Sequence, residues 1–519
     1  MFQIITNEAN SAPELPTWRD LRGLLRSPYT LLLLIFVVSR IVYYLLGVRF
    51  DARGLAGYLQ FIDLDLLQHH LLQSLFYLHM QPPGYNLFLG VVLKLFPHHY
   101  VAAFHAIHLA FGAVITCLLF YLMRCLRVVP KLALITTMLF VVSPGVVLFE
   151  NFILYEYQMM FFLTVSAVLL FHSFAHRSAV SALGFLVCQF WLVMVRNQYH
   201  LVYFAVIYVL LLYFTKHNRR LIAGAGSILL AVVLSLYLKN LLLFGQFVSS
   251  TWMEMNLAIL TSRQLTPEER QLFVSEGKLS RLTGEMEYDS LSPIIGVTVS
   301  SFRPYITMPP PTSIPVLDRE IKFSGATANY NHRGYLEAQK VYRKDVNFLL
   351  LHYPMAYIRL VTIAWFAYFL PNGDFLFFDS NLPHVHGIER FFDNVFFGQF
   401  KHASGAALRQ LHAQGAGLSL VLYTGVFLLI GLPVLFIFGV WFLYRGIRMC
   451  TLDVPQALLL SFLLFNILYC TMTANFLSSY ENNRYRFPVD GFFVVLLTLA
   501  LDQLMRKLIR MRRQGNEHL

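Results

Sequence analysis

Repeated apolar stretches limit this chain more than any other feature of its sequence. Stretches of about 18 to 25 apolar residues do not all fit in one globular core, so they predict helices that span a bilayer. Only 13% of the 519 residues are charged, whereas soluble proteins have about a quarter. The sequence predicts an all-α polytopic membrane protein with about ten transmembrane helices, at about 29–48, 101–123, 132–149, 157–174, 180–195, 200–214, 221–243, 418–442, 455–474 and 488–505.

The positive charge of the chain follows the membrane pattern. The net charge is +12, and most Lys and Arg residues stand in short loops beside the apolar stretches. With ten spans, all of these clusters face one side, which the positive-inside rule assigns to the cytoplasm. We therefore expect an inner-membrane, multi-pass protein that binds anionic lipid headgroups and no nucleic acid.

The polar segments on the other side are longer and carry acids, aromatics and prolines. Two further apolar stretches predict helices that lie on the outer membrane surface: 83–96, which is too short for a full span, and 348–370, which contains His352, Pro354 and Arg359. The expected organisation is an N-terminal membrane module 1–243 with a first outer loop 49–100, a large outer region 244–417, and C-terminal helices with a basic cytoplasmic tail, 418–519.

Three carboxylates at the outer face are candidates for chemistry. Asp51 follows the first apolar stretch by a few residues, and its alternative reading is a solvated residue at the membrane boundary. Glu150 and Glu156 stand in an otherwise apolar stretch. Ionisable groups at membrane depth are functional candidates, and helix capping is the alternative for both.

Two basic positions on the outer side suit a lipid phosphate. Arg196 departs from the charge pattern because it falls on the outer face. Arg484 and Arg486 flank Tyr485 just before the last apolar stretch. Arginine holds phosphate through paired donors, while snorkelling and interfacial anchoring are the alternatives. The chain has no nucleotide-binding motif and no convincing metal spacing.

Together these residues resemble the GT-C superfamily of polyprenyl-phosphate-sugar-dependent glycosyltransferases, in particular the family 39-like branch of protein mannosyltransferases and aminoarabinose transferases. The resemblance covers most of the chain. It comprises an acid after the first span, Gln81-Pro82-Pro83-Gly84-Tyr85-Asn86, a turn from Pro144 to Glu156, His352-Tyr353-Pro354-Met355-Ala356-Tyr357, and Glu481-Asn482-Asn483-Arg484-Tyr485-Arg486-Phe487-Pro488.

The resemblance implies a GT-C-like helix bundle and an inverting transfer of a sugar from polyprenyl phosphate to an acceptor hydroxyl at the periplasmic face. It implies Asp51 as the catalytic base and Glu156 as a second acid. Gln81 stands where some relatives carry a basic residue. The residues expected at the substrate or lipid phosphate are Arg196, Arg484, Gln81, Tyr85 and Arg486.

The expected partners are a polyprenyl-phosphate-linked sugar, an acceptor that is a lipid, glycan or protein, and the membrane lipids. No cofactor is assigned, and a divalent cation at the leaving phosphate stays open. The alternatives are a transporter or flippase for a lipid-linked glycan, and a glycan polymerase or ligase. A transporter typically shows inverted repeats, whereas the outer segments here are strongly asymmetric.

Overall fold

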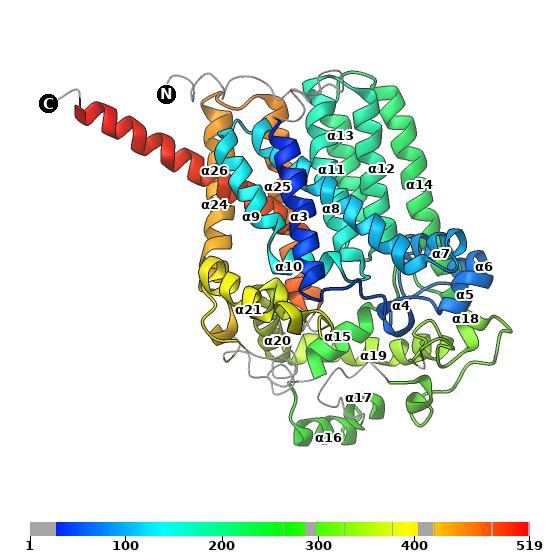
Figure 1. Ribbon diagram of the computed structural model, residues 1–519. Helices are drawn as coiled ribbons and strands as arrows, with labels where there is room; N and C mark the ends of the chain where they lie inside the picture. The colour runs from blue at the N-terminus through cyan, green and yellow to red at the C-terminus, as the bar shows by residue number, and fades with distance from the viewer. Residues whose placement is uncertain are drawn as a thin grey trace.

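The computed structural model describes residues 27–516, apart from 263, 286–296, 326, 376, 403–418, 420 and 479–480. Long helices form an upper bundle and short helices form a layer beneath it (Figure 1). Within the described part, β-structure is limited to two isolated bridges. The helices are α3 (Pro28–Leu45), α4 (Gly54–Gly57), α5 (Leu64–His69), α6 (Leu71–Phe76), α7 (Gly84–Leu95), α8 (Tyr100–Cys125), α9 (Pro130–Val141), α10 (Pro144–Glu150), α11 (Tyr155–Ala175), α12 (Ala179–Val195), α13 (Leu201–Phe214), α14 (Arg219–Phe244), α15 (Met253–Ser262), α16 (Pro267–Ser275), α17 (Arg281–Glu285), η1 (Val299–Phe302), α18 (Pro315–Asp318), α19 (Arg333–His352), α20 (Pro354–Tyr368), η2 (Asn372–Asp374), α21 (Leu382–Phe392), η3 (Asp393–Phe397), η4 (Val421–Tyr423), α24 (Val426–Arg448), α25 (Val454–Leu477) and α26 (Asn482–Asn516).

Six of the described helices are long and apolar enough to cross a bilayer: α3, α8, α11, α14, α24 and α25. Two bent pairs, α9–α10 and α19–α20, raise the number to eight if each pair is one span, and α7, α12 and α13 are shorter apolar helices. The protein is therefore an all-α polytopic membrane protein. A helix stands at each of the ten predicted spans, but the count of ten crossings stays a prediction. The predicted start of one span, at 418, lies outside the described residues.

Two predicted helices are broken, and in both a proline follows the break. The predicted span 132–149 bends by 58° between α9 and α10, which begins at Pro144. The predicted single surface helix over 348–370 is wrong, because α19 ends at His352 and α20 begins at Pro354, with a bend of 97°. Proline lacks an N–H and disfavours helical backbone in the residue before it.

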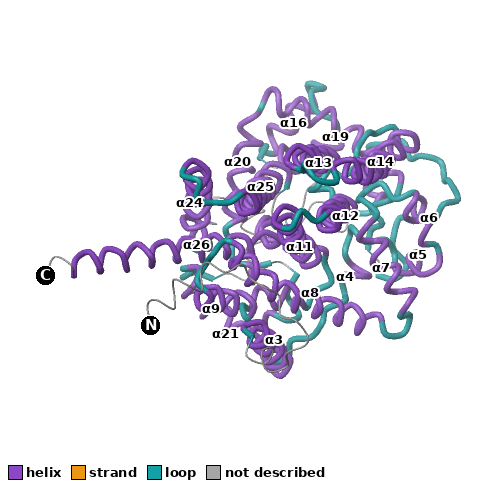
Figure 2. The backbone as a smooth tube through the Cα atoms, turned by 90° about the horizontal axis from the view of Figure 1, so that it is seen from above, coloured by secondary structure: helices purple, strands orange, loops and turns teal. Residues whose placement is uncertain are grey.

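Helix α11 lies at the centre of the bundle. It packs against α8, α12, α25 and α26, and Figure 2 shows it enclosed by these neighbours. Eleven of its 21 residues are buried, including polar ones such as Glu156, Gln158 and Ser166. A helix that is buried around most of its surface has no purely lipid-facing side, so its polar groups face protein partners.

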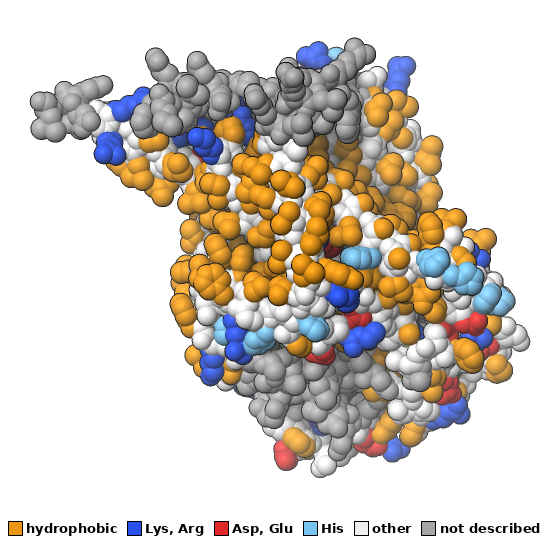
Figure 3. All heavy atoms as spheres, viewed as in Figure 1, with side chains coloured by type: hydrophobic (Ala, Val, Ile, Leu, Met, Phe, Trp, Pro, Cys, Tyr) orange, Lys and Arg blue, Asp and Glu red, His pale blue; other side chains and the backbone are white. Residues whose placement is uncertain are grey.

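The outer surface of the molecule has the pattern of a membrane protein. Hydrophobic side chains gather over the middle of the face seen in Figure 3, and charged side chains gather above and below it. Large apolar side chains on the bundle exterior are exposed, such as Leu242 of α14 and Ile437 of α24. An apolar belt of this kind is stable against lipid and unfavourable in water.

The layer of short helices is attached to the first outer loop by buried hydrogen bonds. His79 contacts the hydroxyl of Thr251 at 2.9 Å, and the Met80 N–H donates to the Asn331 side chain at 3.2 Å. Met80 also belongs to the hydrophobic core of this layer, together with Trp252. The segment that carries Gln81 is thus held by a region some 170 to 250 residues further along the chain.

A second attachment joins residues 319–325 to the loop before α5. The Asp63 carboxylate accepts hydrogen bonds from the Phe323 N–H at 2.6 Å and from the Ser324 hydroxyl at 2.5 Å. The buried Lys322 ammonium donates to the Tyr58 carbonyl at 2.6 Å. Burial lowers the pKa of Lys322 to about 7, against the opposing effect of Asp63.

One ion pair links the first long helix to the broken span. Arg40 of α3 donates from Nε and Nη2 to the two carboxylate oxygens of Glu150, both at 2.8 Å, and Tyr157 donates to Glu150 at 2.6 Å. Helix α8 approaches this pair through a glycine, since a Cβ at Gly112 would lie 2.4 Å from Glu150 Oε2. Glu150 is therefore an ion-pair partner rather than a helix cap.

We expect either single substitution Arg40→Gln or Glu150→Gln to destabilise the protein by about 3 to 5 kcal/mol, because a lone charge stays buried. The double variant should lose less than the sum of the two, because no charge is left unpaired. SDS-induced unfolding in mixed micelles measures this. Additive losses in the double variant would contradict the coupling.

The attachment of residues 319–325 should depend on pH through Lys322. The free ammonium has a pKa of 10.5 and the docked one of about 7, so the detached state binds more protons between these values. The stability of the docked state should therefore rise with pH from about 7 upward, and the equilibrium constant for opening should fall by at most about tenfold per pH unit. Below pH 7 this equilibrium constant should no longer depend on pH.

Hydrogen–deuterium exchange of peptides covering 319–325, corrected for intrinsic exchange rates, measures this opening from pH 6 to 9. Lys322→Met should remove the dependence. Arg319→Met is the control, since Arg319 pairs with Asp65 at 3.0 Å and arginine side chains in general do not titrate between pH 6 and 9. This variant should keep the pH dependence of the opening. An unchanged pH dependence of the opening in Lys322→Met would contradict the assignment of this dependence to Lys322.

Candidate functional site

A carboxylate held by two arginines lies at one end of the central helix. Glu156 stands in the first turn of α11 and is fully buried. Arg196 Nη1 donates to Glu156 Oε1 at 2.5 Å. Arg484 Nε lies 3.2 Å from the same oxygen, without alignment for a hydrogen bond. The two arginine side chains are only 1% and 3% exposed.

Three helix ends place these groups together. Arg196 is the first residue after α12, where the backbone is extended with φ −143° and ψ 136°. Arg484 lies in the first turn of α26, and its Nη2 contacts Glu481 just before that helix at 3.0 Å. The cluster therefore depends on where α11, α12 and α26 end, which their mutual packing determines.

Aromatic rings enclose the two guanidinium groups. The Arg196 guanidinium carbon lies 4.5 Å from the ring centroid of Tyr155 and 4.0 Å from that of Tyr485. The Tyr58 hydroxyl accepts a hydrogen bond from Arg484. Burial raises the pKa of Tyr58 well above its usual value of 10, although Arg484 acts in the opposite direction. Tyr58 is therefore neutral, and its ring excludes water from the cluster.

The cluster leaves buried polar atoms without a partner in the described chain. They include Glu156 Oε2, Arg196 Nη2 and the Tyr85 hydroxyl. A buried polar group without a hydrogen bond costs about 1–3 kcal/mol. The unpaired donors, Arg196 Nη2, Arg484 Nε and the Tyr85 hydroxyl, suit an oxyanion ligand, and phosphate is the best match to guanidinium geometry.

Asp51 lies on the segment next to this cluster but outside it. Its N–H donates to the Asn151 carbonyl at 2.7 Å, and its own carbonyl accepts from Ile153 at 3.1 Å. Its carboxylate accepts from Arg53 Nη2 at 2.7 Å and from the Ser380 hydroxyl at 2.6 Å. At 6% exposure, Asp51 is not the solvated boundary residue of the alternative reading.

The pKa of Asp51 reflects two opposing causes. Burial raises it, but hydrogen bonds from Arg53 and Ser380 outweigh burial, so the pKa lies below its usual 3.8. Asp51 is thus ionised at neutral pH. An ionised carboxylate fits a group that orients a hydroxyl and accepts its proton only as the bond to carbon forms.

The structure brings some of the other predicted residues close to the cluster. Tyr85 of α7 contacts Tyr155, with ring centroids 5.5 Å apart. Gln81 is buried just before α7. Arg486 is not part of the cluster, because it donates to the Tyr368 carbonyl, to Asn372 at 3.0 Å and to Asp490 at 3.0 Å.

Arg486 instead faces a second group of acids. Burial raises the pKa of Asp374 to about 8 and that of Asp393 to about 10, and also raises that of Glu389. Asp374 and Asp393 are therefore largely protonated at neutral pH. Within the described ranges, no group of three or more His, Cys, Asp or Glu residues is arranged to hold a metal ion.

Sequence reasoning placed Glu156, Arg196 and Arg484 at the outer face, and the structure joins them in one cluster. The alternatives for two of them are wrong, because Arg196 is buried in protein rather than snorkelling and Glu156 pairs with arginines rather than capping α11. Sequence reasoning missed Tyr58 and Arg40. Arg40 had a signal, since it is an arginine inside an apolar stretch and requires a buried partner.

Comparisons of the chain with family models, with curated proteins and with solved structures found no match. The resemblance to the GT-C superfamily therefore rests on the motifs themselves.

Glu156→Gln tests whether the cluster binds an oxyanion. Without the carboxylate, Arg196 and Arg484 repel each other in a buried setting, so the unfolding temperature should fall. A short-chain prenyl phosphate should raise that temperature more in this variant than in the wild type, because it replaces the lost anion.

Asp490→Asn is the control, since its side chain is 14% exposed and pairs with Arg486 outside the cluster. It should respond to the prenyl phosphate as the wild type does. Equal stabilisation of Glu156→Gln and wild type would contradict an oxyanion site at this position.

Proposed function

We propose that this protein is an integral membrane glycosyltransferase of the GT-C type. It transfers a sugar, with inversion, from a polyprenyl-phosphate donor to an acceptor hydroxyl at the outer, periplasmic face of the inner membrane. The observation that carries the proposal is the buried pair of arginines on Glu156 at one membrane end of α11. The ten-span topology and the outer placement of 244–417 belong to the same proposal.

The charge that develops on the leaving group accounts for the two arginines in the cluster. When the bond between the sugar and the lipid phosphate breaks, negative charge grows on the phosphate. Preorganised cations in a site without water stabilise such charge far better than they would in solution. In the proposed mechanism Arg196 and Arg484 hold the phosphate, Glu156 keeps both guanidinium groups in place, and Tyr85 donates its free hydroxyl.

The acceptor side is assigned to Asp51. The carboxylate orients the acceptor hydroxyl and takes its proton as the new glycosidic bond forms, while the polyprenyl phosphate leaves from the opposite face of the anomeric carbon. The backbone pairing of Asp51 with residues 151–153, directly before α11, supports this role because it fixes the acid relative to the arginine cluster.

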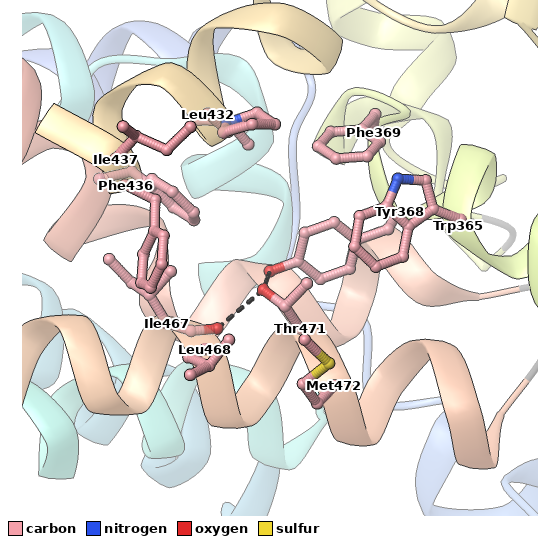
Figure 4. Close-up of a pocket in the computed structure, with 12 residues that line it drawn as sticks. Trp365, Tyr368, Phe369, Leu432, Phe436, Ile437, Ile467, Leu468, Thr471 and Met472 are labelled. Atoms are coloured by element: carbon pink, nitrogen blue, oxygen red, sulfur yellow. Dashed lines mark hydrogen bonds between the residues drawn. The ribbon is translucent and has the colours of Figure 1, made fainter. Parts of the chain in front are cut away.

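An apolar groove supports a lipid-linked donor. A cavity of about 270 Å³ lies between α20, α24, α25 and α26, lined by side chains such as Trp365, Phe436 and Met472 (Figure 4). Its main polar feature is the 2.8 Å contact between the hydroxyls of Tyr368 and Thr471. Helix α26 joins the two places, since it carries Arg484 at its start and a lining residue, Phe493, about 14 Å further on.

Donor turnover tests the proposal. We would supply polyprenyl-phosphate mannose, glucose and aminoarabinose in turn, with a cell-envelope extract as acceptor, and follow free polyprenyl phosphate. We expect release by the wild type and a loss of about 10² to 10⁴ in Asp51→Asn. Because the pKa of Asp51 is below 3.8, the rate should show no acidic limb from this group above about pH 4.

Asp65→Asn is the matched control, because Asp65 lies in the same loop with a side chain 35% exposed and should keep full activity. Full activity of Asp51→Asn, Glu156→Gln, Arg196→Lys and Arg484→Lys would contradict the site. No release with any donor by a folded protein would favour a transporter or flippase, and transfer of a whole glycan would favour a polymerase or ligase.

A further inference from the structure

A second cavity lies at the other end of α11. Its volume is about 280 Å³, and its wall is formed by the end of α11, the start of α12, the connection between α13 and α14, and the start of α25. Six of its twelve lining residues are polar or basic: Ser173, Arg177, Ser178, Thr215, Lys216 and His217.

The cavity and the Glu156 cluster lie at opposite faces of the membrane. Glu156 stands in the first turn of α11 and Ser173 in the last. The helix has 21 residues, which at about 1.5 Å each gives a length of about 30 Å. This matches the hydrocarbon thickness of a bilayer, about 30 Å. The cavity is therefore at the headgroup level of the leaflet that the charge pattern assigns to the cytoplasm.

The positive charges of this cavity lack acidic partners in the part of the chain that the structure describes. Arg177 and Lys216 have no ion pair or side-chain hydrogen bond to any described residue, and no acid lines the cavity. Asp453 precedes the lining residue Val454 in the chain, but its carboxylate caps α25 and lies 3.4 Å from Arg127. Uncompensated cations around a concave surface favour an anionic ligand.

The apolar residues of the lining, called the floor of the cavity below, indicate which kind of anion binds there. Six lining residues are apolar: Phe174, Ala179, Ala182, Phe214, Ile222 and Val454. A free phosphate gains nothing from such a floor, whereas a phospholipid places its glycerol and first acyl carbons beside its phosphate. The volume is slightly below the roughly 300–1,000 Å³ of pockets for whole small molecules, which fits a headgroup whose chains lie outside in the bilayer.

We propose that this cavity is a binding site for one anionic phospholipid, with its phosphodiester held by Arg177 and Lys216 and its glycerol region on the apolar floor. The site lies on the opposite membrane face from the proposed catalytic cluster and is independent of the proposed activity. A lipid bound there joins the ends of α11, α12, α13 and α14, of which α11 and α12 lead to Glu156 and Arg196.

Native mass spectrometry of the full chain, released from nanodiscs of phosphatidylglycerol and phosphatidylcholine, tests this proposal. We expect one retained phosphatidylglycerol on the wild type. Arg177→Gln/Lys216→Gln should bind it roughly 30-fold more weakly, since each Lys or Arg near the headgroup contributes about fivefold. Arg445→Gln/Arg448→Gln removes two charges from the end of α24, outside the lining residues, and should retain the lipid.

A second variant keeps the test decisive if the charge variant unfolds. Ala179→Trp fills part of the apolar floor without changing the charge and should also release the lipid, with thermal unfolding as the check on folding. Equal retention by wild type and both cavity variants would overturn the proposal. Displacement of the lipid by millimolar inorganic phosphate would overturn it in favour of a free-phosphate site. Equal retention of phosphatidylcholine would show that charge has no role.

Discussion

The burial of Glu156 between Arg196 and Arg484 is the interaction on which the rest of the candidate site depends. In a low-dielectric interior a lone carboxylate or guanidinium is strongly unfavourable, so each of the three groups requires the others. Since they come from α11, α12 and α26, the three helix ends are tied to one point. The donors that remain unpaired there, among them Arg196 Nη2 and the Tyr85 hydroxyl, give the cluster its capacity for an oxyanion.

The central helix connects the two membrane faces. Its packing against α8, α12, α25 and α26 leaves little of it in contact with lipid, and Glu156 at its start is fully buried. One end carries Glu156 and the other forms part of the basic cavity. The proposed donor site and the proposed lipid site are thus held by the same rigid element, about one bilayer thickness apart.

The membrane class and the place of the long helices were predictable, because they follow from apolar runs along the chain. The outer position of the arginines stays a prediction from charge asymmetry. The break within 348–370 was less predictable, since apolar content alone favours one continuous helix, whereas Pro354 determines where α19 ends and α20 begins. The pairing of Arg40 with Glu150 joins residues 110 positions apart. No local pattern specifies such a partner.

The sequence by itself determined that the chain spans a membrane and which residue types gather at each face, because transfer of apolar side chains and charges between water and lipid depends on local composition. Only the tertiary structure decided which of these residues meet. It placed Glu156 beside Arg196 and Arg484. It paired the Asp51 carboxylate with Arg53 and Ser380, and it paired Arg486 with Asp490 outside the cluster. Side-chain partners depend on how helix ends pack in space, and spacing along the chain does not encode that packing in any simple way.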